Sequence, residues 1–271
     1  MPDDFAREIL WRPLAMRLAA VAGVRGGTLV GGLCGPQGSG KSTGAEILWG
    51  LLAEAGVSSA VLSLDDLYLP RAERARLATD LHPLFAVRGP PGTHDVGLGL
   101  AVLDALARSG PARLPRFDKA RDDRVGPADW PVAEAPVQVV LFEGWCVGAL
   151  PQPAEALATP VNALEAGEDK DGVWRGAVND ALAGAYQALF SRIDILILLR
   201  PPSFDVVARW RREQEHKLRE RTSGGMTDAE VARFVLHYER LSRWIDREMS
   251  ARADVVVQLD ERRRPVAIWG I

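Results

Sequence analysis

Short apolar segments, each bounded by turn-forming or polar residues, recur along the chain and predict the strands of a sheet. Their uninterrupted hydrophobicity is typical of interior strands that are covered on both faces. A further apolar segment at 254–259 adds a strand, and 266–269 pairs beside it. The four interior strands are predicted at residues 28–34, 60–64, 137–142 and 194–199.

The segments between these strands have apolar residues at helical spacing. Alternation of strands and helices predicts an α/β fold in which a mostly parallel sheet carries helices on both faces. Residues 1–25 are predicted to form an amphipathic N-terminal helix, and residues 1–271 a single domain. The other helices are predicted at 43–52, 96–108, 179–190, 203–221 and 227–249.

Two segments do not follow the alternation, and both are predicted to be surface excursions. Residues 83–91 are rich in proline and glycine, and residues 151–174 contain the acidic stretch 165–171. Functional loops of such sheets gather at the carboxyl ends of the strands, so the first excursion is the better site candidate. The second is interpreted as a solvated insertion.

Composition narrows the class of partner. The formal net charge of -3 provides no broad basic face, so we expect a small-molecule partner and no nucleic acid. Cys34 and Cys146 lie in apolar segments and do not indicate a disulfide framework, which fits a reducing compartment. The acidic start differs from a secretory signal, and no segment has the length of an apolar membrane span. These features predict a cytoplasmic protein without a membrane partner.

Residues 35–42 match the phosphate-binding pattern G-x-x-x-x-G-K-[ST] directly after a predicted strand and before a predicted helix. Its glycines allow backbone N–H groups to face phosphate oxygens beside the positive end of the helix. Lys41 would neutralise β- and γ-phosphate charge, and the Ser42 hydroxyl would bind Mg²⁺. The flanking elements disfavour the alternative, a glycine-rich turn with a chance lysine. The predicted nucleotide-binding residues are Gly35, Gln37, Gly38, Ser39, Gly40, Lys41, Ser42 and Thr43.

ATPases, GTPases and transport motors share this pattern, so the residues that bind a kinase's acceptor must lie elsewhere. A kinase that acts on an alcohol needs a carboxylate to accept the hydroxyl proton, and Asp65, at the end of a predicted strand, is the predicted general base. Asp66 either binds the substrate or caps the next turn. Glu143 ends another strand and is predicted to hold metal-bound water, with an exposed strand-end acid as the alternative.

Further motifs extend over residues 30–250. They are 63–69 (SLDDLYL), 88–89 (RG), 93–95 (THD), 114–119 (LPRFDK), 130–131 (WP), 141–145 (LFEGW), 210–211 (WR) with Glu215, and 225–228 (GMTD). On these residues the chain resembles the D-glycerate 3-kinase family of P-loop kinases, within the branch of phosphoribulokinase, uridine kinase and pantothenate kinase. Their order along the chain favours shared ancestry over coincidence. The resemblance also aligns Asp65 with the catalytic base of the branch.

The resemblance implies ATP and Mg²⁺ as cofactors and D-glycerate as the acceptor, with 3-phosphoglycerate as the product. It aligns Arg88, His94 and Asp95 with the acceptor-binding loop, and the stretch from Arg116 to Lys119 with a second acceptor-side segment. An anionic acid needs a cationic clamp, which Arg88, Arg116 and Lys119 could form, with a hydrogen bond from His94. Each of these residues singly could instead be a solvated charge or the partner of a neighbouring acid.

The helix predicted at 203–221 resembles the lid that closes over ATP in this branch. The lid would extend over 203–226, with Gly224 and Gly225 as its hinge. The resemblance favours Arg211 as the residue that reaches the phosphates, although arginines among glutamates are also typical of a solvent-facing helix with salt bridges. Two other hypotheses stay open, a uridine or pantothenate kinase of the same branch and a P-loop ATPase that acts as a regulatory module.

Overall fold

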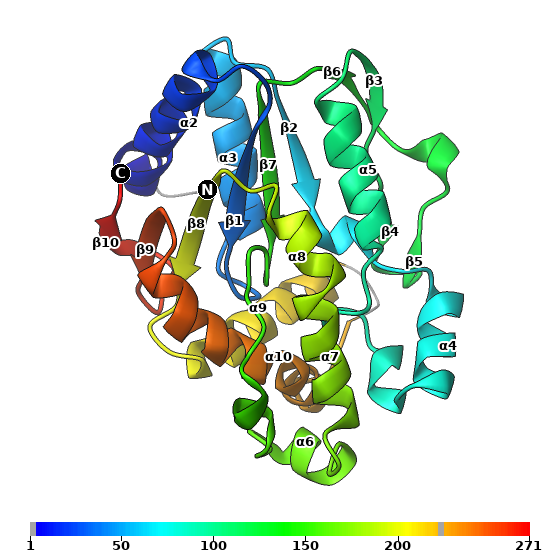
Figure 1. Cartoon of the computed structure of the whole chain (residues 1–271). Helices are drawn as coiled ribbons and strands as arrows, with labels where there is room; N and C mark the ends of the chain where they lie inside the picture. The colour runs from blue at the N-terminus through cyan, green and yellow to red at the C-terminus, as the bar shows by residue number, and fades with distance from the viewer. Residues whose placement is uncertain (1–3, 222–224) are drawn as a thin grey trace.

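The computed structural model describes residues 4–221 and 225–271, and a six-stranded sheet lies at its centre (Figure 1). Its strands are parallel except for the last, which runs antiparallel at one edge. This arrangement confirms the predicted α/β fold and all six predicted strands. In spatial order the strands are β10 (Pro265–Trp269), β9 (Val255–Leu259), β8 (Ile195–Arg200), β1 (Leu29–Cys34), β7 (Val139–Gly144) and β2 (Ser59–Ser63).

The strand that leads into the phosphate-binding turn lies in the middle of the sheet. β1 pairs with β7 from Leu29 opposite Val139, and with β8 on its other side. Every residue of β1 and of β7 is buried, as expected for interior strands. The parallel register brings the carboxyl ends of β1, β7 and β2 to one edge, where residues 35–42, Glu143 and Asp65 follow.

Helices cover both faces of the sheet, as predicted (Figure 1). Successive side chains of a strand point to opposite faces, so the same strands contribute to two apolar clusters. One cluster contains α2, α3 and the start of α9, and the other contains α5, α8 and α10. The main helices are α2 (Arg12–Val24), α3 (Lys41–Glu54), α5 (Val96–Leu106), α7 (Val173–Ala183), α8 (Ala185–Phe190), α9 (Asp205–Arg221) and α10 (Asp228–Glu248).

Two predicted helices differ in detail from the structure. The segment 179–190 belongs to two helices, α7 and α8, which meet at Gly184 with φ of -93° and ψ of -110°. A glycine adopts this conformation readily because it has no Cβ. The N-terminal segment is helical as predicted, but a π-helical turn at Arg7–Trp11 joins α1 (Asp4–Ala6) to α2.

The two segments predicted to be surface excursions instead pack together. Leu84 and Phe85 of the first segment and Leu164 and Trp174 of the second are buried in one apolar cluster. Removing these four apolar side chains from water stabilises the packed arrangement, although the polar residues around them suggested that both segments are exposed. The prediction of surface excursions is therefore wrong for both segments.

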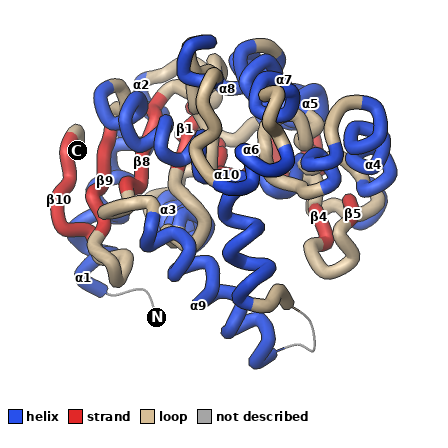
Figure 2. The backbone as a smooth tube through the Cα atoms, turned by 90° about the horizontal axis from the view of Figure 1, so that it is seen from below, coloured by secondary structure: helices blue, strands red, loops and turns tan. Residues whose placement is uncertain are grey.

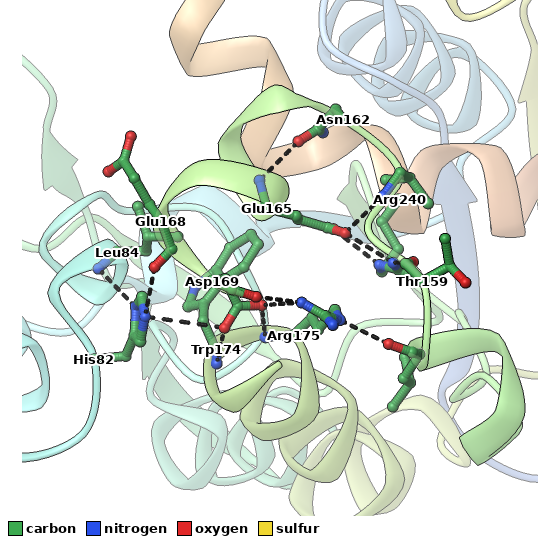
Figure 3. A network of polar contacts seen from close by, with 12 residues as sticks. His82, Leu84, Thr159, Asn162, Glu165, Glu168, Asp169, Trp174, Arg175 and Arg240 are labelled. Carbon is green, nitrogen blue, oxygen red and sulfur yellow. Dashed lines mark hydrogen bonds and ion pairs between the residues drawn. The ribbon is translucent and has the colours of Figure 1, made fainter. Parts of the chain in front are cut away.

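The acidic stretch at 165–171 is held by arginines, as Figure 3 shows. The buried Glu165, on α6 (Ala163–Glu168), accepts hydrogen bonds from Arg240 of α10 at 2.8 and 2.7 Å. The buried Asp169 accepts from Arg175 of α7 at 3.0 Å. Buried carboxylates require such partners. A sequence pattern does not reveal that Arg240, 75 residues away along the chain, pairs with Glu165. The prediction of a solvated insertion is wrong.

Short elements between β2 and β7 escape the sequence prediction. α4 (Arg71–Asp80) follows β2, and β3 (Gly110–Arg113) pairs antiparallel with β6 (Val132–Ala135). β4 (Phe117–Asp118) pairs with β5 (Asp123–Arg124). Strands of two to four residues are too short to show a periodicity. Among the described helices, none combines the length and the apolar character that crossing a membrane requires.

Candidate active site

The predicted phosphate-binding residues form a turn around the start of α3. Gly38 and Gly40 have φ of 80° and 90°, a region that favours glycine. A Cβ at Gly38 would lie 2.5 Å from the Cβ of Trp210 in α9, so a larger residue would displace α9. The Gly38 carbonyl accepts a hydrogen bond from Arg263 Nε at 2.6 Å. The turn places the N-terminus of α3 at the carboxyl edge of the sheet, where it can stabilise bound phosphate.

The remaining residues of the turn differ in their exposure. Ser39 is buried, and its hydroxyl lacks a hydrogen-bond partner among the described residues. A Cβ at Gly35 would lie 2.7 Å from this hydroxyl oxygen. Thr43 is exposed on the first turn of α3, whereas Gln37 and Lys41 line a small cavity. The turn therefore presents Gln37 and Lys41 to that cavity and buries the Ser39 side chain.

Glu143, at the end of β7, contacts the turn directly. Its Oε1 accepts hydrogen bonds from the hydroxyls of Ser42 at 3.1 Å and Ser63 at 2.6 Å. Its Oε2 is buried and has no hydrogen-bond partner in the described part of the chain. Because a buried carboxylate oxygen requires compensation, the position fits a divalent cation or a water bound to it. The described residues contain no group of three or more His, Cys, Asp or Glu side chains that could hold a metal, so phosphate and water oxygens would have to complete its coordination.

Asp65 lies in a 3₁₀ turn directly after β2. Its Oδ2 accepts a hydrogen bond from Lys119 Nζ at 2.6 Å, and its Oδ1 accepts one from the Tyr68 hydroxyl at 2.7 Å. Burial would raise the pKa of Asp65, but the charges of Lys119 and Lys41 and these two hydrogen bonds outweigh burial and lower the pKa below its ordinary value. Asp65 is therefore ionised at neutral pH, and each of its carboxylate oxygens already accepts one hydrogen bond.

Asp65 forms part of the wall of a cavity of about 60 Å³, which we call the acceptor cavity. Since a single water requires roughly 10–15 Å³ of cavity volume, the cavity holds only a few waters or a small organic molecule. It contains four cations and one carboxylate, and an anion could bind by replacing the acids with which Arg88, Lys119 and Arg211 are paired. The cavity is lined by Gln37, Lys41, Asp65, Tyr68, Arg88, Lys119, Trp145, Arg211, Phe234 and Tyr238.

Arg88 is fixed in the wall of the acceptor cavity from several directions. Its guanidinium pairs with Asp122 and lies 5.7 Å from the centroid of the Phe117 ring. Its backbone carbonyl accepts a hydrogen bond from the Tyr238 hydroxyl at 2.9 Å. Asp122 also pairs with the buried Arg74 at 2.9 Å. The position of Arg88 is therefore set by the protein itself, without an acceptor.

Arg116 and Asp66 face a larger opening that shares Asp65 with the acceptor cavity. The Asp66 carboxylate accepts hydrogen bonds from Arg116 at 3.2 Å and from the Phe117 backbone N–H at 3.0 Å. Burial raises the pKa of Asp66. Asp66 thus fastens β4 to the turn after β2, and neither residue lines the acceptor cavity itself. Their contact with substrate stays a prediction.

His94 and Asp95 lie behind the wall of the acceptor cavity. The buried His94 ring stacks on Tyr68 with 4.7 Å between centroids, and its Nδ1 lies 2.6 Å from the Tyr186 hydroxyl. Burial lowers the pKa of His94 to about 3, so the ring is neutral. Asp95 caps α5 and pairs with Arg124 at 3.0 Å. Tyr68 lines the acceptor cavity, whereas His94 and Asp95 do not, so their predicted contact with acceptor stays a prediction.

Arg211 extends from α9 to the acceptor cavity. It pairs with Glu215 and lies 5.3 Å from the centroid of the Phe234 ring, and its Nε has no hydrogen-bond partner among the described residues. Figure 2 shows α9 extending away from the sheet beside α10. Gly225 has φ of 132°, whereas Gly224 lies outside the described residues. The lid and its hinge stay predictions.

The aromatic residues of the acceptor cavity are missing from the sequence prediction. The Trp145 indole donates a hydrogen bond to the Gly89 carbonyl at 3.0 Å and meets Tyr238 edge-on at 4.8 Å. Tyr68 and Trp145 lie in the motifs 63–69 and 141–145 at the ends of two strands, and their place in these motifs could have identified them as site residues. Phe234 and Tyr238 are four residues apart on α10, a spacing that equally fits a helix face turned to the core.

Comparison with known proteins agrees with this architecture. No protein family model matches the chain. It is 38% identical over 219 residues to the uncharacterized kinase mug58 of Schizosaccharomyces pombe, over 76% of this chain and 77% of that protein. It is 34% identical over 222 residues to the chloroplastic D-glycerate 3-kinase of Arabidopsis thaliana, over 78% of this chain and 46% of that protein. The structure of D-glycerate 3-kinase from Cryptococcus neoformans matches with a TM-score of 0.77 and 27% identity, over 95% of this chain and 96% of that one.

The fold, the phosphate-binding turn and these relatives define a P-loop kinase. Within this class, the chain belongs to the D-glycerate 3-kinase family. The chain spans about half the length of the plant relative, at 46%. The acceptor therefore has to be inferred from the residues of this chain.

Proposed function

We propose that this P-loop kinase transfers the γ-phosphoryl group of ATP to a small hydroxy acid, and that the acid is D-glycerate. The observation that carries the proposal is the acceptor cavity, where one carboxylate, Asp65, lies among the cations of Lys41, Arg88, Lys119 and Arg211. A hydroxy acid has both groups that such a cavity suits, a carboxylate for the cations and a hydroxyl for the base. The name of the acid is supported by the plant and fungal relatives.

In the proposed transfer, a hydroxyl oxygen of the acid attacks the γ-phosphorus while its proton moves to Asp65. The bond from the γ-phosphorus to the bridging oxygen of ADP breaks, so the products are the phosphorylated acid and ADP. Lys41 neutralises charge on the transferring group. Mg²⁺ bound beside Ser42 and Glu143 would neutralise further phosphate charge. Asp65 then loses its proton to solvent, which restores the starting state.

The acid acceptor would also activate the base. Without acceptor, the hydrogen bonds from Lys119 and Tyr68 make Asp65 a weak base. An acceptor carboxylate that pairs with Lys119 would weaken the bond from Lys119 to Asp65 and raise the pKa of Asp65. A neutral alcohol has no group that could do this. The same contact thus supports both affinity and turnover for an acid.

The size of the acceptor cavity supports a small acid over a nucleoside. A volume of about 60 Å³ suits a three-carbon acid, whereas uridine exceeds the acceptor cavity and would have to extend past Asp65 and Lys119 into the larger opening. Uridine also lacks a carboxylate for the four cations. A uridine kinase activity therefore has less support than glycerate kinase activity.

An acceptor screen by ADP release tests the proposal. D-Glycerate should support turnover, and glycerol, which has the same carbon skeleton without the carboxylate, should have a kcat/KM at least about 100-fold lower. Phosphorus NMR of the product would identify the phosphorylated hydroxyl, which we expect to be the one on carbon 3. Turnover with uridine or pantothenate but not with D-glycerate would reject the acid acceptor. ATP consumption that needs no acceptor would favour a regulatory ATPase.

A cytoplasmic location is also part of the proposal. Cys34 and Cys146 are both free and buried. Free thiols are typical of a reducing compartment. Cell fractionation of the natural source would test the location.

A further inference from the structure

A second cavity, of about 380 Å³, lies behind the phosphate-binding turn, between the end of β8 and α10. We call it the rear cavity. Its volume falls within the range of roughly 300–1,000 Å³ that is typical of small-molecule sites. Apolar side chains from several elements form its walls, among them Trp145, Leu198, Phe204, Val207 and Ile245. Such walls suit the carbon skeleton of a ligand.

Three polar side chains of the rear cavity are available to a ligand, those of Ser203, Ser242 and Arg247. The Ser242 hydroxyl oxygen is buried and has no hydrogen-bond partner in the described chain. Arg247 is exposed, its Nε donates to the Arg243 carbonyl at 3.2 Å, and no carboxylate of residues 4–221 or 225–271 forms an ion pair with it. The other two charged residues, Arg243 and Asp246, already have ion-pair partners. The rear cavity therefore offers a buried hydroxyl at Ser242, an exposed hydroxyl at Ser203 and the cation of Arg247.

We infer that the rear cavity binds a small monoanion with an apolar body, such as an aromatic or branched carboxylate. The apolar walls would cover the body, the Ser242 hydroxyl would make a hydrogen bond, and Arg247 would pair with the acid group. A polyanion suits the rear cavity less well because Arg243, the other cation in its wall, is already paired with Glu239, and the carboxylate of Asp246 would repel further negative charge. Lys41 and Asp65 do not line the rear cavity, so it is distinct from the acceptor cavity.

An occupant of the rear cavity would touch the kinase machinery. Gly35 and Pro36 of the phosphate-binding turn line it, and Trp145 lines both cavities. α10 contributes Ser242 to the rear cavity and Tyr238 to the acceptor cavity. We therefore expect the ligand to change KM for ATP or for the acceptor by about fivefold or more. This regulatory effect rests on the proposed function, whereas ligand binding does not.

Fluorescence titration with anilinonaphthalene sulfonate, an aromatic monoanion, tests binding on the full chain with saturating MgADP present. We expect saturable binding of one probe per chain. Ser242→Leu fills the rear cavity and removes the hydroxyl, and Arg247→Glu reverses the free charge, so each should weaken binding about fivefold or more. Arg76→Glu, at an exposed arginine on α4, is the matched control and should leave probe affinity unchanged. Thermal melts followed by circular dichroism would establish that the variants are folded.

The outcomes separate the inference from the proposed function. Probe binding that is not saturable, or that keeps its affinity in both variants, would overturn the inference. Probe displacement by MgADP would also overturn it, because the rear cavity would then belong to the nucleotide site. Binding as expected in a protein that does not phosphorylate D-glycerate would leave the rear cavity standing and reject only the glycerate proposal.

Discussion

Asp65 is the residue on which the proposed transfer depends most directly. Asp65→Asn removes the proton acceptor while keeping the size of the side chain. We expect kcat to fall by about 10²–10⁴-fold, the usual contribution of a general base, with ATP affinity retained. Steady-state kinetics and nucleotide titration would measure both quantities. Asp129→Asn, at an exposed aspartate, is the control, and near-normal kcat in the Asp65 variant would remove Asp65 as the base.

Lys119 makes the largest contribution to the lowering of the pKa of Asp65. In the native protein the pKa of Asp65 lies below its ordinary value of 3.8, so kcat/KM should not fall through this group until the pH is below 4. Lys119→Ala removes a positive charge that counteracts the effect of burial on Asp65. We therefore expect the pKa of Asp65 to rise and the acid limb of kcat/KM to move to higher pH. KM for D-glycerate should rise as well. An acid limb that stays in place would show that Lys119 does not control this pKa.

His94 should make stability depend on pH. Its pKa of about 3 in the folded state lies below the ordinary value of 6.5, so the unfolded chain binds more protons between these values. The contribution is complete above pH 6.5 and is lost as the pH falls toward 3. His94→Gln, which stays neutral, should reduce the fall in Tm between pH 7 and pH 4.5. Equal slopes in both proteins would contradict a buried neutral His94.

Residues at strand ends could be predicted from the sequence, but their partners could not. Asp65 and Glu143 follow apolar segments, and parallel pairing brings such positions to one edge. The hydroxyl of Ser63 and the aromatic wall around Tyr238 are supplied by three-dimensional packing. His94 illustrates the limit, because a motif indicates that a histidine is present but not that it is buried behind Tyr68.

At the scale of elements, the insertion at 151–174 is fastened to α10 by a buried ion pair. Glu165→Gln leaves Arg240 buried without its charge partner, so we expect a loss of about 3–5 kcal/mol in the free energy of unfolding. Glu168→Gln breaks an exposed pair with Arg233 and should cost less than about 1 kcal/mol. Urea denaturation of both variants measures the difference. Similar values would mean that the insertion does not stabilise α10 through this pair.

Elements with a strong periodicity could be predicted, whereas breaks and long-range contacts could not. α10 could be predicted because its apolar positions recur at helical spacing, and the structure adds a capping box formed by Thr227 and Glu230 at its start. The interruption between α7 and α8 was missed because a single glycine within a helical pattern is often tolerated. The insertion was misjudged because its acids pair with arginines from other helices. Periodicity carries no information on such pairs.

At the scale of the whole molecule, the divalent cation should connect catalysis to nucleotide binding. Removing Mg²⁺ with EDTA should abolish ADP release, and added MgCl₂ should restore it, because the cation neutralises phosphate charge during transfer. Ser42 and Glu143 alone supply too few ligands for the cation, so phosphate has to complete its coordination. Glu143→Gln should raise the Mg²⁺ concentration that gives half-maximal rate. Full activity in EDTA would remove the metal from the mechanism. ATP with Mg²⁺ should also raise Tm more than ATP alone.

The central position of β1 has a consequence in time. Leu29 pairs with Val139 and Gly31 with Ile195, so both neighbours of β1 are synthesised long after it. At roughly 5–20 residues per second, these neighbours appear on the order of 5 to 35 s later. During this interval an apolar strand lacks its hydrogen-bonding partners and is open to aggregation. The yield of active kinase should therefore depend on the rate of translation, and a chaperone that shields β1 on the ribosome should raise it.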